Sequence, residues 1–198
     1  KGAAFQVKAR REVILSGGAI NSPQLLMLSG VGDAKHLKSC GIEPVLDARA
    51  VGQNLQDHIA VSYFYKVRTP TLNDQLNPLL GKIRAGLHYV LDRSGPLSLS
   101  VNQSGGFIRS DASKSHPDLQ LYFSPVSYTK TPLSERKLLN PDPFSAFLLS
   151  HNPCRPNSRG HIELASANPA EHPLIHPNYL ATQSDVDDVL AGNRLLRQ

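Results

Sequence analysis

The sequence contains few cysteines and lacks tryptophan altogether. Its 198 residues include two cysteines, one methionine and no tryptophan, and aromatic residues make up only 6%. Cys40 and Cys154 lie far apart and form no C-x-x-C pair, which argues against a disulfide framework or a zinc site and favours two free thiols in a reducing compartment. No apolar run approaches the roughly 18 residues of a membrane span.

A clustered excess of one charge is also missing. The 21 basic and 16 acidic residues give a net charge of +5 and a pI near 9.3. Apart from residues 8–11, the basic side chains are scattered and are not interleaved with aromatics, so nucleic acid is not a predicted partner. With 40% hydrophobic and 19% charged residues, the composition is typical of a globular protein. The length allows one large domain or two small ones.

Several catalytic and binding motifs are absent. The sequence has no G-x-S-x-G element and no P-loop. Gly30-Val31-Gly32 is only half of a dinucleotide fingerprint, and it follows a predicted helix instead of a strand. His172 and His176 have helical metal-ligand spacing, but the prolines that follow each of them forbid a helix. We therefore predict turn or strand histidines there and no metal site.

The most informative stretch is residues 11–32. Val13, Ile14 and Leu15 form a short apolar run, which predicts a strand covered on both faces over residues 11–16. Residues 17–19 are Gly-Gly-Ala, a sequence that allows a sharp turn and a close approach of the backbone. The order predicts a strand, a tight turn and a helix that begins with free main-chain amides.

The helix signals follow directly. Asn21 or Ser22 is a suitable N-cap, Pro23 suits the first helical position, and Gly30 is placed to end the helix in a left-handed conformation. A helix start carries partial positive charge and binds anionic ligands. The predicted cofactor-binding residues at this corner are Gly17, Gly18, Ala19, Asn21, Ser22 and Pro23.

Three segments resemble one protein family. The first reads Gly18-Ala19-x-x-Ser22-Pro23-x-Leu25-Leu26-x-x-Ser29-Gly30-Val31-Gly32 and resembles the second signature of the glucose-methanol-choline (GMC) family of flavin oxidoreductases. Residues 51–58 resemble the family's Val-Gly-x-Asn-Leu-x-Asp-His segment. Residues 155–160, together with residues 173–180, resemble its C-terminal segment.

The resemblance implies an α/β plus α+β fold. The end of a Rossmann-like FAD-binding domain, residues 1–58, would join an antiparallel-sheet substrate domain with helices on one face, residues 59–198. The sequence begins without Met and stops within a predicted helix, so we expect an internal piece of a longer protein. Its expected location is the cytoplasm or a membrane surface.

The implied activity is FAD-dependent oxidation of a small-molecule alcohol, as in alcohol or choline dehydrogenases and oxidases. The family's catalytic histidine and its histidine or asparagine partner would lie beyond Gln198, so no catalytic residue is predicted within the chain, which alone should be inactive. Oxygen and a quinone both stay open as the electron acceptor. Another flavin- or nucleotide-dependent oxidoreductase and a non-catalytic binding role are the alternatives.

Two polar pairs need an interpretation. Asp57 and His58 could form a catalytic pair, but we favour bracing of an ordered loop. Asn102 and Gln103 precede a Gly-Gly-Phe-Ile-Arg segment that the resemblance places at the substrate cavity; capping of strand ends is the alternative. Choline-specific relatives tend to carry a carboxylate at the position of Gln103. Since a neutral amide offers a quaternary ammonium neither full charge nor a π face, Gln103 favours a neutral alcohol.

The remaining periodicity predicts the other elements. Strands are expected at residues 4–8, 59–67, 118–124, 144–150 and 161–165, with at most a short edge strand at 42–46. Asp33 should cap a short helix that Gly41 closes. Residues 76–91 keep helical apolar spacing and should pack one face on a sheet, and Ser184 with Asp187 is expected to form the capping box of the last helix.

Overall fold

The computed structural model describes residues 6–100, 102–129 and 139–198, which fall into two compact units. The first unit contains the chain up to Asp57 together with residues 158–179, and the second contains residues 58–157 and 180–198. The domain division expected at 58/59 stays a prediction; of the residues on its C-terminal side, 158–179 belong to the first compact unit. They do so because a strand within them pairs with a strand that precedes Asp57.

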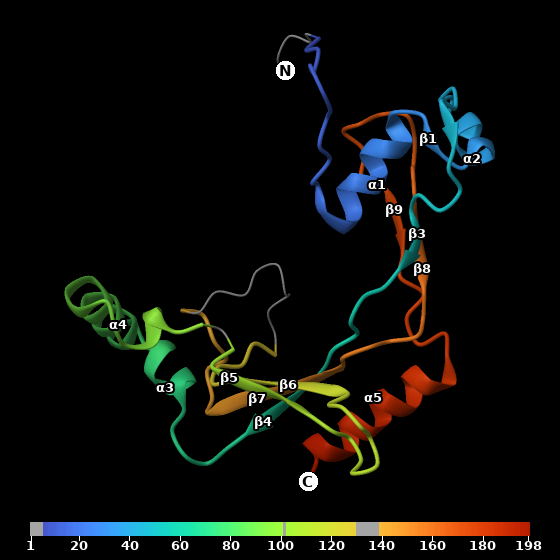
Figure 1. Cartoon of the computed structure of the whole chain (residues 1–198). Coiled ribbons are helices and arrows are strands. Elements are labelled where there is room, and N and C mark those ends of the chain that lie inside the picture. Colours follow the sequence, from blue (N-terminus) through green and yellow to red (C-terminus); the bar gives the residue numbers. More distant parts are fainter. Residues whose placement is uncertain (1–5, 101, 130–138) are drawn as a thin grey trace. The chain divides into compact units, whose positions relative to one another are not determined.

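The described part of the first unit combines helices with small sheets (Figure 1). Its elements are α1 (Gly18–Leu28), β1 (Val31–Gly32), α2 (Ala34–Ser39), β2 (Leu46–Asp47), β3 (Gln53–Leu55), β8 (Gly160–Glu163) and β9 (Leu174–His176). β1 and β2 pair in parallel, and β3, β8 and β9 form an antiparallel sheet with β8 in the centre. Met27, Leu37, Ile162 and Leu164 form the core. The expected Asp33 cap of α2 is confirmed, because its carboxylate accepts the N–H of His36 at 2.9 Å.

The second unit is built on a four-stranded antiparallel sheet. Its elements are β4 (Val61–Lys66), α3 (Leu72–Leu76), α4 (Leu79–Asp92), the 3₁₀ turn η1 (Pro96–Ser98), β5 (Ser104–Ile108), β6 (Leu119–Ser124), β7 (Ala146–Pro153) and α5 (Gln183–Leu196). The strand order is β4-β7-β6-β5, and Figure 1 shows α5 lying along one face. The strands expected at 59–67, 118–124, 144–150 and 161–165 correspond to β4, β6, β7 and β8.

Aromatic side chains and α5 hold the centre of this sheet together. Tyr65 stacks on Phe147 with ring centroids 5.2 Å apart, and Phe123 packs on the same ring at 5.7 Å. The Tyr65 hydroxyl donates to the carbonyl of Leu196 near the end of α5. Aromatic pairs on one sheet face contribute beyond their buried area, so the face that α5 covers is well specified.

The strand expected at residues 11–16 is wrong for the described chain. Residues 11–16 form no strand, and the side chains of Val13 and Ile14 are 77% and 76% exposed. Residues 6–8 of the strand expected at 4–8 also lack strand structure, whereas residues 4 and 5 lie outside the described residues. A strand requires a hydrogen-bonded neighbour, and none of the described strands lies beside this segment.

The expected packing of the 76–91 helix is also wrong. Residues 72–76 form α3, which starts with a capping box between Thr71 and Asp74. α4 contacts α3 and η1, and it buries only Ala85 fully. Its remaining large apolar side chains are exposed: Leu79, Leu80, Ile83, Leu87, Val90 and Leu91. The apolar periodicity correctly predicts a helix, but periodicity does not say what covers its face.

The last helix begins earlier than expected. α5 starts at Gln183 with Thr182 as N-cap, whose hydroxyl accepts the N–H of Asp185 at 3.3 Å. Ser184 therefore lies inside the helix instead of capping it, because Thr182 offers the same hydroxyl chemistry two residues earlier. No helix among the described residues combines the length and apolar character needed to cross a membrane.

Candidate functional site

The corner at residues 17–23 is the start of α1, shifted from the expected position. The helix begins at Gly18 with Gly17 as N-cap, so Asn21 and Ser22 lie within its first turns and Pro23 lies in its interior. The expected capping role of Asn21 or Ser22 is wrong, because Gly18 adopts a φ of +81°. This conformation is readily available only to glycine, and it turns the chain into the helix before those side chains are reached.

The amides at this helix start have no competing side chain in the structure. No side chain caps the helix at Gly17, and its first turn contains no acidic residue. Gly17, Gly18, Ala19 and Asn21 are exposed, whereas Ser22 and Pro23 are half-buried. A Cβ placed on Gly18 would meet no atom within 4 Å, so the space in front of the corner is open. Free N–H groups and the helix dipole together favour an anionic ligand here.

A hollow of about 280 Å³ adjoins this corner. It is lined by Ala19 and Pro23 from α1, by residues 52–56 around β3 and by Ile162 from β8. Two of the sequence segments singled out above, 18–32 and 51–58, therefore meet at one site in the first unit. Gly52 lets residues 51–58 lie close against β8. Its φ is +81°, and its carbonyl accepts the Ile162 N–H at 2.7 Å. A Cβ at this position would lie 2.3 Å from the Ile162 carbonyl oxygen.

Gly30 has the expected structural role. It ends α1 with a φ of +82°, and its carbonyl accepts the N–H groups of Val45 and Leu46. A Cβ at this position would lie 2.8 Å from the Val45 side chain. The interpretation of Gly30-Val31-Gly32 as a helix end is confirmed.

Asp57 and His58 serve as braces in different units. The Tyr179 hydroxyl donates to the Asp57 carboxylate, and this hydrogen bond raises the pKa of Tyr179. The His58 ring accepts the Asn152 side-chain amide at Nδ1 (3.0 Å) and donates from Nε2 to the Cys154 carbonyl (3.1 Å). This pattern places the proton of a neutral ring on Nε2. The predicted loop bracing is confirmed.

Asn102 and Gln103 lie just before β5 on the exposed surface. The Gln103 side-chain amide donates to the Ser100 carbonyl at 2.9 Å, and its main-chain N–H donates to the Phe123 carbonyl at the end of β6. Gln103 thus closes a local turn at a strand end. Its role toward a substrate stays a prediction, as does that of Asn102.

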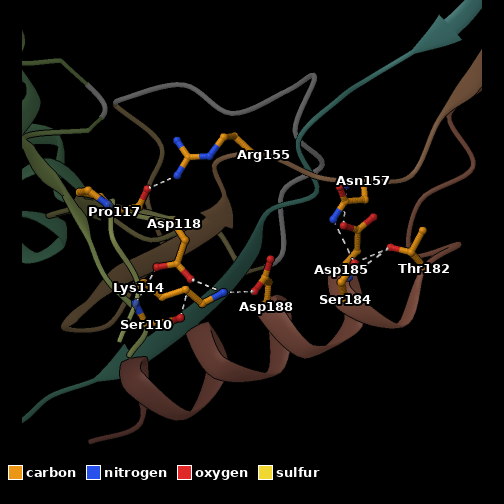
Figure 2. Close-up of polar contacts among 10 residues, drawn as sticks. All are labelled: Ser110, Lys114, Pro117, Asp118, Arg155, Asn157, Thr182, Ser184, Asp185 and Asp188. Atoms are coloured by element: carbon orange, nitrogen blue, oxygen red, sulfur yellow. Dashed lines mark hydrogen bonds and ion pairs between the residues drawn. The ribbon is translucent and has the colours of Figure 1, made fainter. Parts of the chain in front are cut away.

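Residues 155–157, the start of the C-terminal motif, are held by polar contacts within the second unit, as Figure 2 shows. Arg155 donates to the Pro117 carbonyl at 2.7 Å, which agrees with an arginine that pins a loop to backbone carbonyls. The buried Asp185 carboxylate accepts the N–H of Asn157 at 2.7 Å. These contacts fix the loop that follows β7 against β6 and α5.

An ion-pair cluster adds a second connection to α5 (Figure 2). Lys114 lies 3.4 Å from both Asp118 and Asp188. The Asp188 charge, followed by the contacts with Asp118, raises the pKa of Lys114. Burial would raise the pKa of Asp118, but hydrogen bonds from Ser110 and Lys114 outweigh burial and lower it. The cluster therefore ties the loop between β5 and β6 to the last helix.

Sequence reasoning missed one group of side chains. It considered His176 together with His172, whereas the structure places His176 beside His161 and Glu163. Polar and apolar residues alternate in residues 161–163, and this pattern places His161 and Glu163 on one face of the strand. In the structure, burial alternates in the same way along β8. The pairing of β9 with β8, which adds His176, required the structure.

Comparison with known proteins identifies matches at both ends of the chain. Two family profiles described as GMC oxidoreductase match it, an N-terminal one at residues 1–60 and a C-terminal one at residues 156–198. The mitochondrial choline dehydrogenase of Homo sapiens is 40% identical over 201 residues, which cover 100% of this chain and 32% of that protein. An oxygen-dependent choline dehydrogenase of Brucella canis is 40% identical over 193 residues, with coverages of 97% and 34%.

A solved structure shares the fold. A formate oxidase from Aspergillus oryzae, studied for its FAD modification, superimposes with a TM-score of 0.80 at 28% identity and covers 96% of this chain and 37% of that one. The chain spans about a third of the length of the curated relatives it matches.

Proposed function

The chain belongs to the GMC oxidoreductase family, and we propose on this basis that it forms part of an FAD-dependent enzyme that oxidises the CH–OH group of a small alcohol. The observation that carries this proposal is the corner at the start of α1. Its main-chain amides are exposed, uncapped by side chains and next to a hollow lined by the second family segment.

The residues at this corner fit the negatively charged part of FAD. The helix start supplies N–H donors and partial positive charge, and Gly18 leaves open space in front of them. Gly17, Gly18, Ala19, Asn21, Ser22 and Pro23 are the residues that would hold the cofactor. FAD, when bound, supplies the hydride-accepting chemistry of the reaction.

The chain's own contribution is to bind and to position. The first unit offers a wall for the cofactor, and the antiparallel sheet of the second unit offers a substrate-facing scaffold. The base that takes the hydroxyl proton of the alcohol is expected outside residues 1–198. We therefore assign no proton-transfer role to the histidines of this chain.

Two alcohols are the substrate candidates, each favoured by a separate observation. Choline is named in the relatives that are 40% identical to this chain. The neutral side-chain amide of Gln103 favours an uncharged alcohol, since a quaternary ammonium is attracted by a carboxylate or an aromatic cage. We propose an uncharged alcohol as the better substrate.

The cofactor proposal is tested with two glycines that share the same backbone strain. Gly18 and Gly41 both have positive φ, +81° and +76°, and a Cβ on either would meet nothing within 4 Å. In the intact protein, Gly18→Ala should weaken FAD binding about tenfold, or about 1.4 kcal/mol, whereas Gly41→Ala should leave it unchanged. Flavin absorbance relative to protein measures the occupancy, and equal occupancy in the two variants would contradict the proposed site.

The substrate proposal is tested separately, by the ratio of kcat/KM values for neutral alcohols and for choline. Purified intact enzyme should show a higher kcat/KM for neutral primary alcohols than for choline, and Gln103→Glu should shift that ratio several-fold toward choline. Gln75→Glu, on the exposed surface of α3, is the matched control and should not change the ratio. A wild-type preference for choline would refute the neutral-alcohol proposal and leave the FAD site intact.

A further inference from the structure

Two histidines and a glutamate converge on the outer face of the β8–β9 hairpin. His161 on β8 pairs directly with His176 on β9, and Glu163 lies two residues further along β8 on the same face. The Glu163 carboxylate is 3.7 Å from His161 Nε2 and 3.9 Å from His176 Nε2. The imidazole rings stack with centroids 4.5 Å apart. One ligand atom from each residue falls within 4.8 Å of the other two.

The backbone that carries these side chains is well fixed. β8 is the central strand of its sheet, with β3 on one side and β9 on the other, and its Ile162 is buried in the core. Gly160 lets β9 approach closely, since a Cβ there would lie 1.9 Å from the His176 carbonyl oxygen. The Asn178 side chain donates to the Arg159 carbonyl at 3.0 Å and connects the same ends of the two strands.

We propose that His161, Glu163 and His176 form a binding site for a divalent transition metal ion such as Zn²⁺. Two imidazole nitrogens and one carboxylate are a ligand set that suits Zn²⁺, Ni²⁺ and Cu²⁺. All three side chains are about 40–50% exposed, so water can complete the coordination. The proposal concerns a site separate from the α1 corner and does not depend on the proposed enzymatic function.

The observed spacing is close to what an ion needs. At metal–ligand distances of about 2.1 Å, two ligand atoms of a tetrahedral site lie about 3.4 Å apart. The two Glu163–histidine distances therefore need to shorten by only about 0.5 Å, and no pair of ligand atoms by more than about 1.4 Å, which side-chain rotation provides. The ion would link β8 to β9 through side chains, in addition to the ladder hydrogen bonds, and the Glu163 charge would partly offset its own.

Zinc titration of the intact protein tests the site. After dialysis against EDTA, isothermal titration with ZnCl₂ should show one saturable equivalent that EDTA reverses, and zinc should raise the Tm because it binds only the folded state. His161→Ala, His176→Ala and the isosteric Glu163→Gln should each weaken zinc binding about tenfold or more and abolish the rise in Tm.

His172→Ala is the matched control. His172 is an exposed histidine of the same unit that does not belong to the cluster, so its removal should leave the affinity and the rise in Tm unchanged. The proposal is overturned if the wild-type protein binds no zinc, if Glu163→Gln binds as well as wild type, or if His172→Ala loses the site. Flavin content should be equal in all four variants, which separates this result from the cofactor proposal.

Discussion

Two apolar segments of this chain predict a buried strand, and they end up in opposite surroundings. β7 lies between β4 and β6 and is covered by α5, and all but two of its eight residues are buried. Residues 13–15 have the same short apolar run, yet they form no strand, and Val13 and Ile14 are largely exposed. The sequence of a segment sets its preference for strand structure, but a strand forms only where neighbouring backbone is available for pairing.

The contrast between β7 and residues 13–15 indicates which parts of the chain contribute to its stability. The second unit supplies its own ladder partners, its aromatic packing and its covering helix. At the corner before α1, no side chain caps the helix, and the side chains of Val13 and Ile14 are largely exposed. Substitutions in the β7 region should therefore cost stability in the chain itself, whereas substitutions at residues 13–15 should not.

The largest effect is expected at the contact between β7 and α5. A Cβ on Gly192 would lie 2.2 Å from His151 Nδ1 and 2.3 Å from Cε1. His151 is fully buried and held through Nε2 by the Asn193 side chain at 2.9 Å, so its ring cannot move aside. Gly192→Ala should lower the free energy of unfolding by about 3 kcal/mol, at the upper end of overpacking costs, as measured by urea denaturation.

A second helical glycine provides the control for this substitution. A Cβ on Gly86 in α4 would meet nothing within 4 Å. Gly86→Ala should raise the free energy of unfolding by about 0.5–1 kcal/mol through helix propensity alone. If both variants were equally stable, close packing of α5 on β7 would not be the reason that position 192 is glycine.

The next effect concerns the loop that joins β7 to β8. Asp185 is 2% exposed and accepts the Asn157 N–H at 2.7 Å (Figure 2). Asp185→Asn keeps the shape but removes the charge of the acceptor, so it should cost about 1–2 kcal/mol. Asp187→Asn, on the exposed side of the same helix, should stay within about 0.5 kcal/mol. Thermal unfolding of the two variants measures these losses in stability. Similar losses for Asp185→Asn and Asp187→Asn would show that the buried contact contributes little.

The strands β4, β6 and β7 of the second unit could be predicted from sequence because their signals are local. Alternation in residues 61–66 and 119–124 needs only a two-residue period. The start of α1 could not be placed in this way. Asn21 and Ser22 are good caps by residue type, but the positive φ of Gly18 lets the helix begin at Gly18, with Gly17 as N-cap, and no periodicity carries that information.

The candidate sites also differ in how far local sequence signals predict them. A glycine turn that leads into a helix could be predicted near residues 17–23 because its residues are contiguous in sequence, although the first residue of the helix could not. The hollow that joins this corner to residues 52–56 depends on a tertiary approach, as does the pairing of His161 with His176. Strand register between segments a dozen residues apart is set by turn geometry and core packing, which residue types alone do not specify.

A smaller, pH-dependent effect is expected at Asp118. Its pKa is lowered in the folded chain because hydrogen bonds from Ser110 and Lys114 outweigh its burial. The stabilisation is therefore present above the unfolded pKa of about 3.9 and is lost as the pH falls through the lower folded value. Asp118→Asn should cost about 1 kcal/mol at pH 7, and this difference in unfolding free energy should shrink toward zero in acid. A difference independent of pH would exclude the ionised carboxylate as its source.

The smallest effect is expected at Ile14. Because its side chain is 76% exposed in the structure, Ile14→Ala should change the free energy of unfolding of the 198-residue chain by less than about 0.5 kcal/mol. In a protein as long as the curated relatives, further backbone could pair with residues 11–16 and bury this side chain, and the same substitution should then cost about 2–5 kcal/mol. Urea denaturation of wild type and Ile14→Ala, in the 198-residue chain and in the full-length protein, measures this difference in the free energy of unfolding. A large cost in the short chain would mean that residues 13–15 already pack there, whereas no cost in either length would mean that this apolar run is not a core strand of the protein.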